Sequence, residues 1–302
     1  MIETMISVNN LLKKYNGVPV VNNLNFSVQK GEVFGLLGPN GAGKTTTLEC
    51  IEGMRKSDGG EINISGFNIQ QQEKEIRKIL GIQLQVASLP ENLHPKEAMQ
   101  LICGWNGQQV RLDLLKRFGL ESLSNKQYGQ MSTGQKRRLH LALALACNPT
   151  IVILDEPTAG LDVQGRAELH EAVRELKDKN TTIILATHDM SEAESLCDRI
   201  AIMIQGQIAT IGTPAQITSA ARRETRITLL TQNNSLLPGH DIGDAHFSKE
   251  KDGYGVWTSK DTANAVIALL NNVRHNEDKV IDLRVERPSL EEAFLDLIEG
   301  GQ

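Results

Sequence analysis

The sequence predicts an α/β fold in which a mostly parallel core sheet is followed by a small second domain of the α+β class. Three observations predict it. A buried apolar run at residues 33–37 leads into a glycine-rich loop and then into a helix. Two more apolar runs, 151–154 and 182–187, end in polar residues, as central strands of such a sheet do. After Arg223 short strands and helices start again, which indicates a separate unit of about 80 residues.

The glycine-rich loop has the spacing G-x-x-x-x-G-K-T and consists of Gly38, Pro39, Asn40, Gly41, Ala42, Gly43, Lys44, Thr45 and Thr46. Its glycines allow positive φ and keep Cβ atoms away, so backbone amides can point at an anion. The following helix adds about half a positive charge at its N-terminus. Lys44 supplies a full charge for the β- and γ-phosphates, and the Thr45 hydroxyl is placed to bind Mg²⁺. A plain strand-to-helix turn needs none of this, so the loop predicts a P-loop NTPase core.

Composition limits the possible functions. The chain has 302 residues, enough for two domains, and a net charge of -5, which gives no general attraction to nucleic acid or acidic lipid. Aromatic residues make up only 4%, which argues against a base-stacking surface. No apolar run approaches the roughly 20 residues that span a bilayer, and the N-terminus lacks a secretory signal. The four cysteines are scattered, which favours free thiols in a reducing cytosol.

The first third of the chain predicts a second sheet beside the core. Residues 1–30 form short β-like runs separated by turn residues, which indicates a mostly antiparallel edge sheet. Tyr15 lies in this sheet, where it either packs against neighbours or stacks on a nucleotide base. A charged helix is expected over residues 73–80, followed by a strand over 81–85 that ends in Gln85.

A helical subdomain is expected between the strands, over residues 87–147. Pro95 suits the first position of a helix, and residues 112–118 form a second helical stretch. Ser132 and Gln135 have the spacing of a capping box, so another helix should begin at Ser132. The cations at 136–138 oppose the helix dipole there. They are either solvated or suited to meeting an anion.

Polar residues follow the two central apolar runs. Asp155 and Glu156 come directly after residues 151–154, and His188 follows residues 182–187. The carboxyl edge of an open α/β sheet is where ligands bind, so two carboxylates there could serve Mg²⁺ and a water. A lone histidine is more often structural, but strands that all end in polar residues on one edge favour function.

The remaining segments complete the two domains, which we expect to divide at residues 1–222 and 223–302. Ser191 and Glu194 have the spacing to cap a helix, a hairpin is expected over 199–211, and Pro214 begins a last helix of the first domain. The second domain is expected to contain strands at 227–231, 255–258 and 280–285, a helix at 263–270, and a final helix capped by Ser289.

Taken together, residues 5 to 220 resemble the ATP-binding cassette (ABC) proteins that power membrane transporters. The family's elements match in order: Tyr15 as the adenine-stacking aromatic, 38–46 as Walker A, Gln85 as the Q-loop glutamine, 131–135 as the signature, 151–156 as Walker B, 159–162 as the D-loop and His188 as the switch histidine. Seven elements in the right order are far more specific than any one of them.

The resemblance implies an ATPase that uses ATP and Mg²⁺. Lys44 and the loop amides would hold the phosphates, with Mg²⁺ on Thr45, Asp155 and Gln85. Glu156 would be the general base, His188 would contact the γ-phosphate, and Gln85 would help with the attacking water. Two chains would sandwich two nucleotides head to tail, each facing the other's nucleotide through Ser132, Gly134, Gln135 and Asp162.

Two residues depart from the family pattern. Thr133 replaces a glycine of the signature L-S-G-G-Q, and His94 stands where many relatives carry a threonine cap. If Ser132 caps the helix, Thr133 is its first residue with helical φ and ψ, where a β-branched side chain is tolerated. At the other end of the chain, residues 287–294 resemble the accessory tail of subunits that pair with drug-exporter-type permeases.

We therefore expect an ATPase subunit that energises export through a separately encoded membrane permease. It would be cytoplasmic, peripheral on the inner face of the cell membrane, and a homodimer or a heterodimer with a second cassette, without nucleic acid. One alternative is a non-transport ABC ATPase in translation or DNA repair, but such proteins usually carry two cassettes or a long coiled-coil insertion. Another is a nucleotide sensor without hydrolysis, which the presence of Glu156 and His188 argues against.

Overall fold

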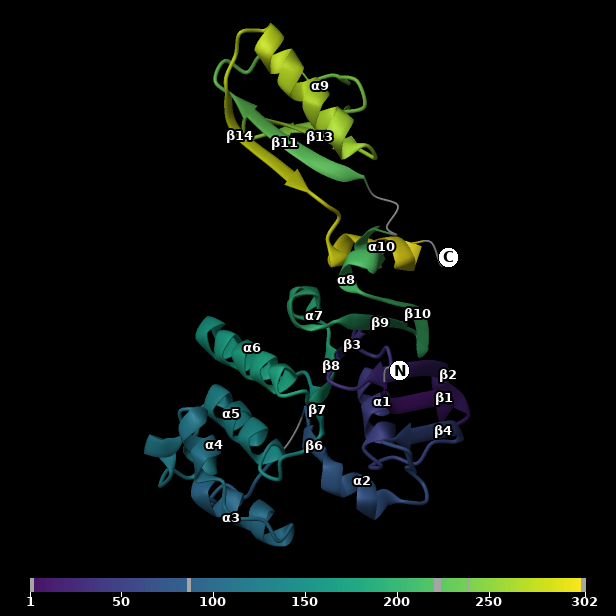
Figure 1. Cartoon of the computed structure of the whole chain (residues 1–302), viewed down its shortest axis with the longest axis vertical. Coiled ribbons are helices and arrows are strands. Elements are labelled where there is room, and N and C mark those ends of the chain that lie inside the picture. Colours follow the sequence, from purple (N-terminus) through teal and green to yellow (C-terminus); the bar gives the residue numbers. More distant parts are fainter. Residues whose placement is uncertain (1–2, 86–87, 220–223, 238, 300–302) are drawn as a thin grey trace. The chain divides into compact units, whose positions relative to one another are not determined.

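The computed structural model describes residues 3–85, 88–219, 224–237 and 239–299 (Figure 1). The chain divides into two compact units, residues 1–214 and 215–302. The boundary expected between residues 222 and 223 lies outside the described residues, as does residue 87, where the helical subdomain was expected to start. Helix α8 (Pro214–Ser219) begins at the observed division.

A six-stranded sheet forms the centre of the first unit, in the order β10-β9-β3-β8-β7-β6 (Figure 1). Its strands are β3 (Val33–Leu37), β6 (Leu80–Gln83), β7 (Ile151–Asp155), β8 (Thr182–Thr187), β9 (Arg199–Ile204) and β10 (Gln207–Gly212). All pairs are parallel except the β9–β10 hairpin. Every residue of β3, β7 and β8 is buried, which explains their unbroken apolar sequences. The α/β fold class with a P-loop core is confirmed.

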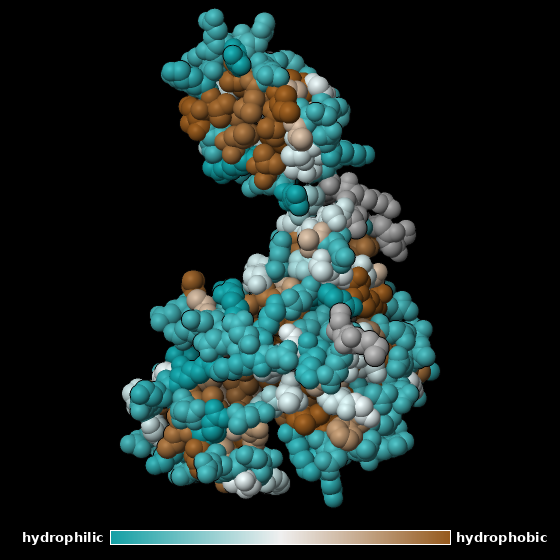
Figure 2. All heavy atoms as spheres, in the orientation of Figure 1, coloured by the Kyte–Doolittle hydropathy of each residue, from teal (hydrophilic) through white to brown (hydrophobic). Residues whose placement is uncertain are grey.

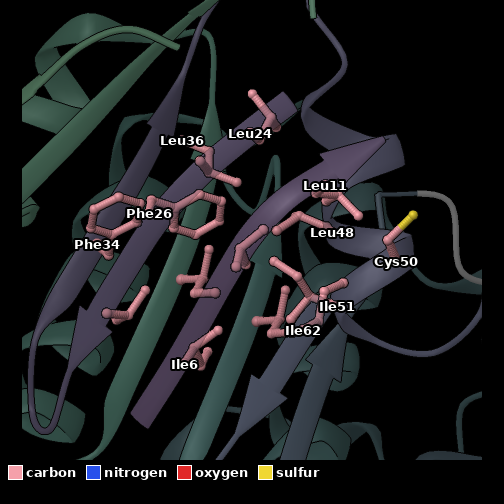
Figure 3. Close-up of a cluster of buried hydrophobic side chains, with 14 of the residues drawn as sticks. Ile6, Leu11, Leu24, Phe26, Phe34, Leu36, Leu48, Cys50, Ile51 and Ile62 are labelled. Carbon is pink, nitrogen blue, oxygen red and sulfur yellow. The ribbon is translucent and has the colours of Figure 1, made fainter. Parts of the chain in front are cut away.

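A four-stranded antiparallel sheet lies beside the core, in the order β2-β1-β4-β5. It contains β1 (Thr4–Tyr15), β2 (Val18–Gln29), β4 (Gly59–Ile64) and β5 (Phe67–Asn68). Helix α1 (Lys44–Ile51) contributes Leu48 and Ile51 to a hydrophobic cluster shared by both sheets, together with Ile6, Leu11, Phe26 and Phe34 (Figure 3). This shared core fixes the start of α1, and with it the glycine-rich loop, against the end of β3.

The region between β6 and β7 is helical. It contains α3 (Pro95–Trp105), α4 (Leu112–Arg117), two short 3-10 turns (Glu121–Leu123 and Tyr128–Gln130) and α5 (Thr133–Ala144), while α2 (Glu73–Ile79) precedes β6. Pro95 is the first residue of α3, as expected. His94 caps that helix with help from Glu97, whose carboxylate accepts the His94 backbone N–H at 2.9 Å. Glu97 thus compensates for the missing threonine.

Two helices follow β7 and β8, namely α6 (Val163–Asp178) and α7 (Met190–Leu196). The expected capping of α7 by Ser191 and Glu194 is wrong. Asp189 is the N-cap residue, and its Oδ1 accepts the backbone N–H groups of Ser191 at 2.9 Å and Glu192 at 3.1 Å. An aspartate at this position reaches two free amides, which leaves Ser191 inside the first turn.

The second unit contains a four-stranded antiparallel sheet in the order β12-β13-β11-β14. Its strands are β11 (Thr225–Thr231), β12 (His246–Lys251), β13 (Tyr254–Ser259) and β14 (Val280–Glu286). Helix α9 (Thr262–His275) shares a small core with β11 and β13, centred on the buried Trp257 and Leu269. Helix α10 (Leu290–Glu299) follows Ser289, whose Oγ accepts the Glu292 N–H at 3.2 Å.

Candidate active site

The glycine-rich loop connects β3 to α1, and its glycines are required by its conformation. Gly41 and Gly43 have φ of 82° and 98°, in the left-handed region. At Gly38 a Cβ atom would lie 2.4 Å from the Met203 carbonyl oxygen, and at Gly43 it would lie 2.7 Å from that of Val20. The loop therefore packs closely against β2 and β9, where no side chain fits.

Lys44 is the first residue of α1 and is only 6% exposed. Its Nζ donates to the carbonyl oxygens of Gly38 at 2.8 Å and Pro39 at 3.2 Å, and it lies 3.6 Å from Oε1 of Glu156. The side chain therefore folds back over the loop and links it electrostatically to the end of β7. A full positive charge is concentrated where the loop amides and the helix N-terminus already favour an anion.

Asp155 is the last residue of β7 and is buried, and its Oδ1 has no hydrogen-bond partner among the described residues. Burial raises the pKa of its carboxyl, while a hydrogen bond from the Thr45 hydroxyl lowers it. A buried, partnerless carboxylate oxygen is costly unless something binds it. An orphan oxygen next to a hydroxyl is the donor set that a hard cation such as Mg²⁺ prefers, so these two residues fit the ion.

Glu156 follows β7 in a strained conformation, with φ of 49°. Its backbone N–H donates to the Ala186 carbonyl of β8 at 2.9 Å, which fixes the residue against the neighbouring strand. Its Oε2 lies 2.5 Å from Nδ1 of His188, which follows β8. The structure therefore brings Glu156, His188 and Lys44 together, although 144 positions separate Lys44 from His188 in the sequence. Backbone strain of this kind, of order 1–3 kcal/mol, clusters at functional sites.

Gln85 lies in the loop after β6, two residues beyond the strand end, and its side chain is exposed. The glutamine that ends β6 is instead Gln83, which is buried, and neither of its side-chain amide atoms has a hydrogen-bond partner among the described residues. The loop is tied to the helical region, because Nη1 of Arg137 in α5 donates to the Leu84 carbonyl at 3.3 Å.

The signature residues begin α5 as expected. Ser132 is the N-cap residue: its Oγ accepts the Gln135 N–H at 3.3 Å, and its own N–H donates to Oε1 of Gln135 at 3.0 Å. This oxygen of Gln135 also accepts from Lys126 Nζ at 3.2 Å, so the glutamine side chain stabilises the helix start. Thr133 is the first residue of α5, as expected.

The D-loop packs next to this helix start. A Cβ on Gly160 would lie 3.2 Å from Cγ2 of Thr133, and one on Gly134 would lie 3.5 Å from Cδ2 of Leu161. Asp162 caps α6 by accepting the Gly165 N–H at 2.8 Å. Within residues 3–85 and 88–219, no hydrogen bond or ion pair joins residues 132–135 or Asp162 to loop 38–46.

Tyr15 lies at the end of β1, and its ring is partly exposed. The guanidinium of Arg55 lies 5.2 Å from the ring centroid and Nζ of Lys13 lies 5.7 Å from it. Cation–π contacts of this kind orient an exposed ring. They are compatible with either of the roles that the sequence leaves open.

Two charged residues near the site were not assigned a role from the sequence. Arg137 is partly buried, which lowers the pKa of its guanidinium, while the charges of Asp155 and Glu156 raise it. In the sequence, the three consecutive basic residues at 136–138 were the feature that could have pointed to Arg137. Glu52, just after α1, is buried, and its carboxylate oxygens have no hydrogen-bond partner among the described residues. Burial, and to a lesser extent the charge of Asp155, raises the pKa of Glu52 to about 7. In the sequence, Glu52 could have been noticed as a charged residue one helical turn after the buried Leu48.

Glu52→Gln is expected to stabilise the protein at alkaline pH. The folded state keeps the Glu52 proton up to about pH 7, whereas the ordinary pKa of a glutamate is 4.5, so the free energy of unfolding falls as pH rises between these values. The variant removes this fall, worth about 3 kcal/mol. Urea unfolding at pH 5 and pH 8 measures it, with the exposed Glu171→Gln as control. If the variant and the unmodified chain differ in free energy of unfolding by the same amount at both pH values, the raised pKa of Glu52 is refuted.

The geometry defines a class of protein, a P-loop ATPase. Comparisons with known proteins agree. The ABC transporter family profile matches residues 21–159. The linearmycin resistance ATP-binding protein LnrL of Bacillus subtilis is 32% identical over 97% of this chain and 98% of its own length. The daunorubicin resistance ATP-binding protein DrrA3 of Streptomyces coeruleorubidus is 33% identical over 98% and 96%.

Solved structures give the same result. A structure of the ATP-binding subunit of an ABC transporter has a TM-score of 0.66 and 29% identity, covering 71% of this chain and 92% of its own. A dimeric bacterial ABC transporter cassette has a TM-score of 0.65 and 27% identity, covering 69% and 98%. The chain belongs to the family of ABC transporter ATP-binding proteins. It is an ATPase.

Proposed function

We propose that this chain energises export through a separately encoded integral-membrane permease. The observation that carries the proposal is the arrangement of the buried Lys44 and Glu156 with His188 beside the loop, which supplies the parts for ATP hydrolysis. Support for export comes from the relatives, because two proteins named for drug resistance match over nearly the whole chain, including the second unit. Among the described residues, no helix is both long and apolar enough to cross a bilayer, so the proposal places the pathway in another chain.

Phosphate binding would begin with an exchange of partners at Lys44. Its Nζ now donates to two loop carbonyls and faces Glu156. A triphosphate in the loop offers charged oxygens, which are stronger acceptors than carbonyls. The ammonium would then turn to the β- and γ-phosphates, while the amides of residues 40–46 hold them from the other side. Phosphoryl transfer depends mostly on such positioning and charge neutralisation.

The attacking water would lose its proton to Glu156. The carboxylate is buried, and His188 Nδ1 holds its Oε2 at 2.5 Å, so one oxygen is oriented while the other faces the loop. A positioned general base typically contributes about 10²–10⁴-fold in rate. His188 has a largely exposed side chain, which leaves its other nitrogen free to reach the γ-phosphate.

Mg²⁺ would be held by Asp155 and Thr45, with Gln85 as a further ligand. When bound, the ion neutralises the developing phosphate charge. The partnerless Oδ1 of Asp155 is the feature that favours the ion over a purely structural carboxylate.

A second cassette would complete each site. Ser132, Gly134, Gln135 and Asp162 lie on helix starts away from the loop of their own chain, and they would face nucleotide bound by the partner. A dimeric cassette among the structural relatives supports this arrangement. Whether both cassettes are copies of this chain is taken up below.

Thr133→Gly is expected to change ATP turnover less than about tenfold. Thr133 already lies at the first helical position of α5, where Ser132 keeps its cap, and its methyl group would lie 3.2 Å from a Cβ atom placed on Gly160. Phosphate release at saturating MgATP measures the change. Thr133→Ala is the matched control, since it removes the methyl and hydroxyl without adding glycine's flexibility. A rise above tenfold in the glycine variant would contradict the argument.

The transport partner can be tested by affinity purification of the tagged chain from detergent-solubilised membranes. The proposal predicts that an integral-membrane protein copurifies and that it stimulates ATP turnover. Full activity without any membrane association would contradict it. Stimulation by RNA or DNA at physiological salt would instead favour a role in translation or DNA repair, but the relatives above are named as resistance or transport proteins.

A further inference from the structure

We propose that two copies of this chain pair through β14 of the second unit, antiparallel and around a two-fold axis at Leu283. Among the described strands, β14 hydrogen-bonds only to β11, so it is an edge strand. Its pairing with β11 skips Ile281, which marks a bulge near the start of the strand, and residues 282–286 beyond it are regular. Their other side presents backbone N–H and C=O groups, and an uncovered edge of this kind is a template for another strand.

Apolar side chains are left uncovered along this edge. Leu283 joins the small core under α9, so Val285, two positions further along the regular part of the strand, points to the same face. Val285 remains 46% exposed, and Ile281 in the bulge is 61% exposed, because α9 packs on β11 and β13. Figure 2 shows apolar side chains gathered on the surface of this unit. This face therefore lacks cover at the edge strand.

The sequence of β14 is complementary to itself in one register. With Leu283 at the axis, Asp282 lies opposite the partner's Arg284, within the regular part of the strand. Moving the axis to Asp282 would oppose two aspartates, and moving it to Arg284 would oppose two arginines. Like charges directly opposite each other destabilise a sheet and opposite charges stabilise it. The charge pattern therefore selects a second copy of this strand, in this register.

The side chains already point the right way for this pairing. Within one chain, Arg284 Nη2 lies 2.7 Å from Oδ2 of Asp282, and the Tyr254 hydroxyl donates to the same oxygen at 3.2 Å. Two such groups around the axis would form a network of two cations and two anions. The four charges around the axis would then balance one another.

The contact is small compared with a standard interface, so the pairing is reversible. Its consequence is a raised effective concentration: chains joined at β14 stay together while their cassettes separate after hydrolysis. The inference makes the transporter's two cassettes copies of one chain. The test of the β14 pairing does not depend on ATP turnover, so the pairing can be correct even if the proposed transport function is wrong.

Disulfide trapping of the full chain without nucleotide tests the pairing. Opposed Cα atoms in an antiparallel pair lie about 4.5–5.5 Å apart, within the range of a disulfide. Leu283→Cys should therefore give a covalent dimer under mild oxidation that a reductant reverses. The controls are the unmodified chain and Val18→Cys, at a position 63% exposed in the other unit. Dimer no more abundant than in these controls would overturn the proposal.

A charge swap tests the register. In the Leu283→Cys background, Asp282→Arg places four cations around the axis and should lower the dimer yield at least tenfold. Adding Arg284→Asp restores opposite charges across the axis and should restore the yield. Circular dichroism of each variant checks that the sheet is folded. If the single reversal has no effect, or the double swap fails to restore the dimer in a folded chain, the register is wrong.

Discussion

Glu156→Gln is expected to lower ATP turnover at least a hundredfold while MgATP binding is kept. The amide has the shape of the carboxylate but cannot accept the proton of the attacking water. Lys44 and the loop amides are unchanged, so the phosphates retain their ligands. In the proposed two-chain site, hydrolysis would release the two cassettes, so the variant should accumulate a nucleotide-bound dimer.

Phosphate release and sedimentation velocity in MgATP measure the two effects. Glu171→Gln, at an exposed position of α6, is the matched control and should behave as the unmodified chain. Unchanged turnover in the Glu156 variant would remove this residue from its role as the base. Slow turnover without a nucleotide-dependent dimer would instead contradict the two-chain site.

Lys44→Ala is expected to weaken ATP binding by at least about thirtyfold. The Lys44 ammonium is the one full charge that the loop itself contributes, and hydrogen bonds to charged groups are worth about 1.5–3 kcal/mol each. Its removal also leaves Glu156 buried without the cation 3.6 Å away, which makes the site more repulsive to phosphate.

Equilibrium titration with a fluorescent ATP analogue measures the loss. Lys56→Ala is the control, since that lysine is exposed shortly after α1 and contributes no loop ligand. The thermal unfolding temperature should be compared as well, because Lys44 donates to two loop carbonyls. An affinity within threefold of the unmodified chain would show that the loop amides suffice and that the charge is unimportant.

The parts of the fold that could be predicted are those with strong local patterns. β3, β7 and β8 are wholly buried, so each appears in the sequence as an unbroken apolar run. β12 was not expected, because its sequence from His246 to Lys251 is polar and its residues are mostly exposed. The N-cap of α7 was predicted at the wrong residue because Asp189 and Ser191 are both good capping residues. Which of the two caps the helix depends on the direction in which the chain leaves β8.

The candidate site could be predicted where a residue's role follows from the motif that contains it. Lys44, Asp155, Glu156 and His188 each lie at a strand end or a helix start, and parallel strands bring those positions to one edge. Glu52 could not be assigned, because its pKa depends on burial beside Asp155, which no local pattern encodes. The proposed half-site at Ser132 would need a second chain, and no single motif in the sequence says whether that chain is a copy of this one.

Calorimetric titration of ATP and Mg²⁺ into the full-length Glu156→Gln chain tests the central claim most directly, since hydrolysis then adds little heat. The account predicts saturable heat with one nucleotide per chain, and loss of that heat in the Glu156→Gln/Lys44→Ala double variant. A folded chain that gives no heat at millimolar nucleotide, or the same heat with Lys44 removed, would contradict it.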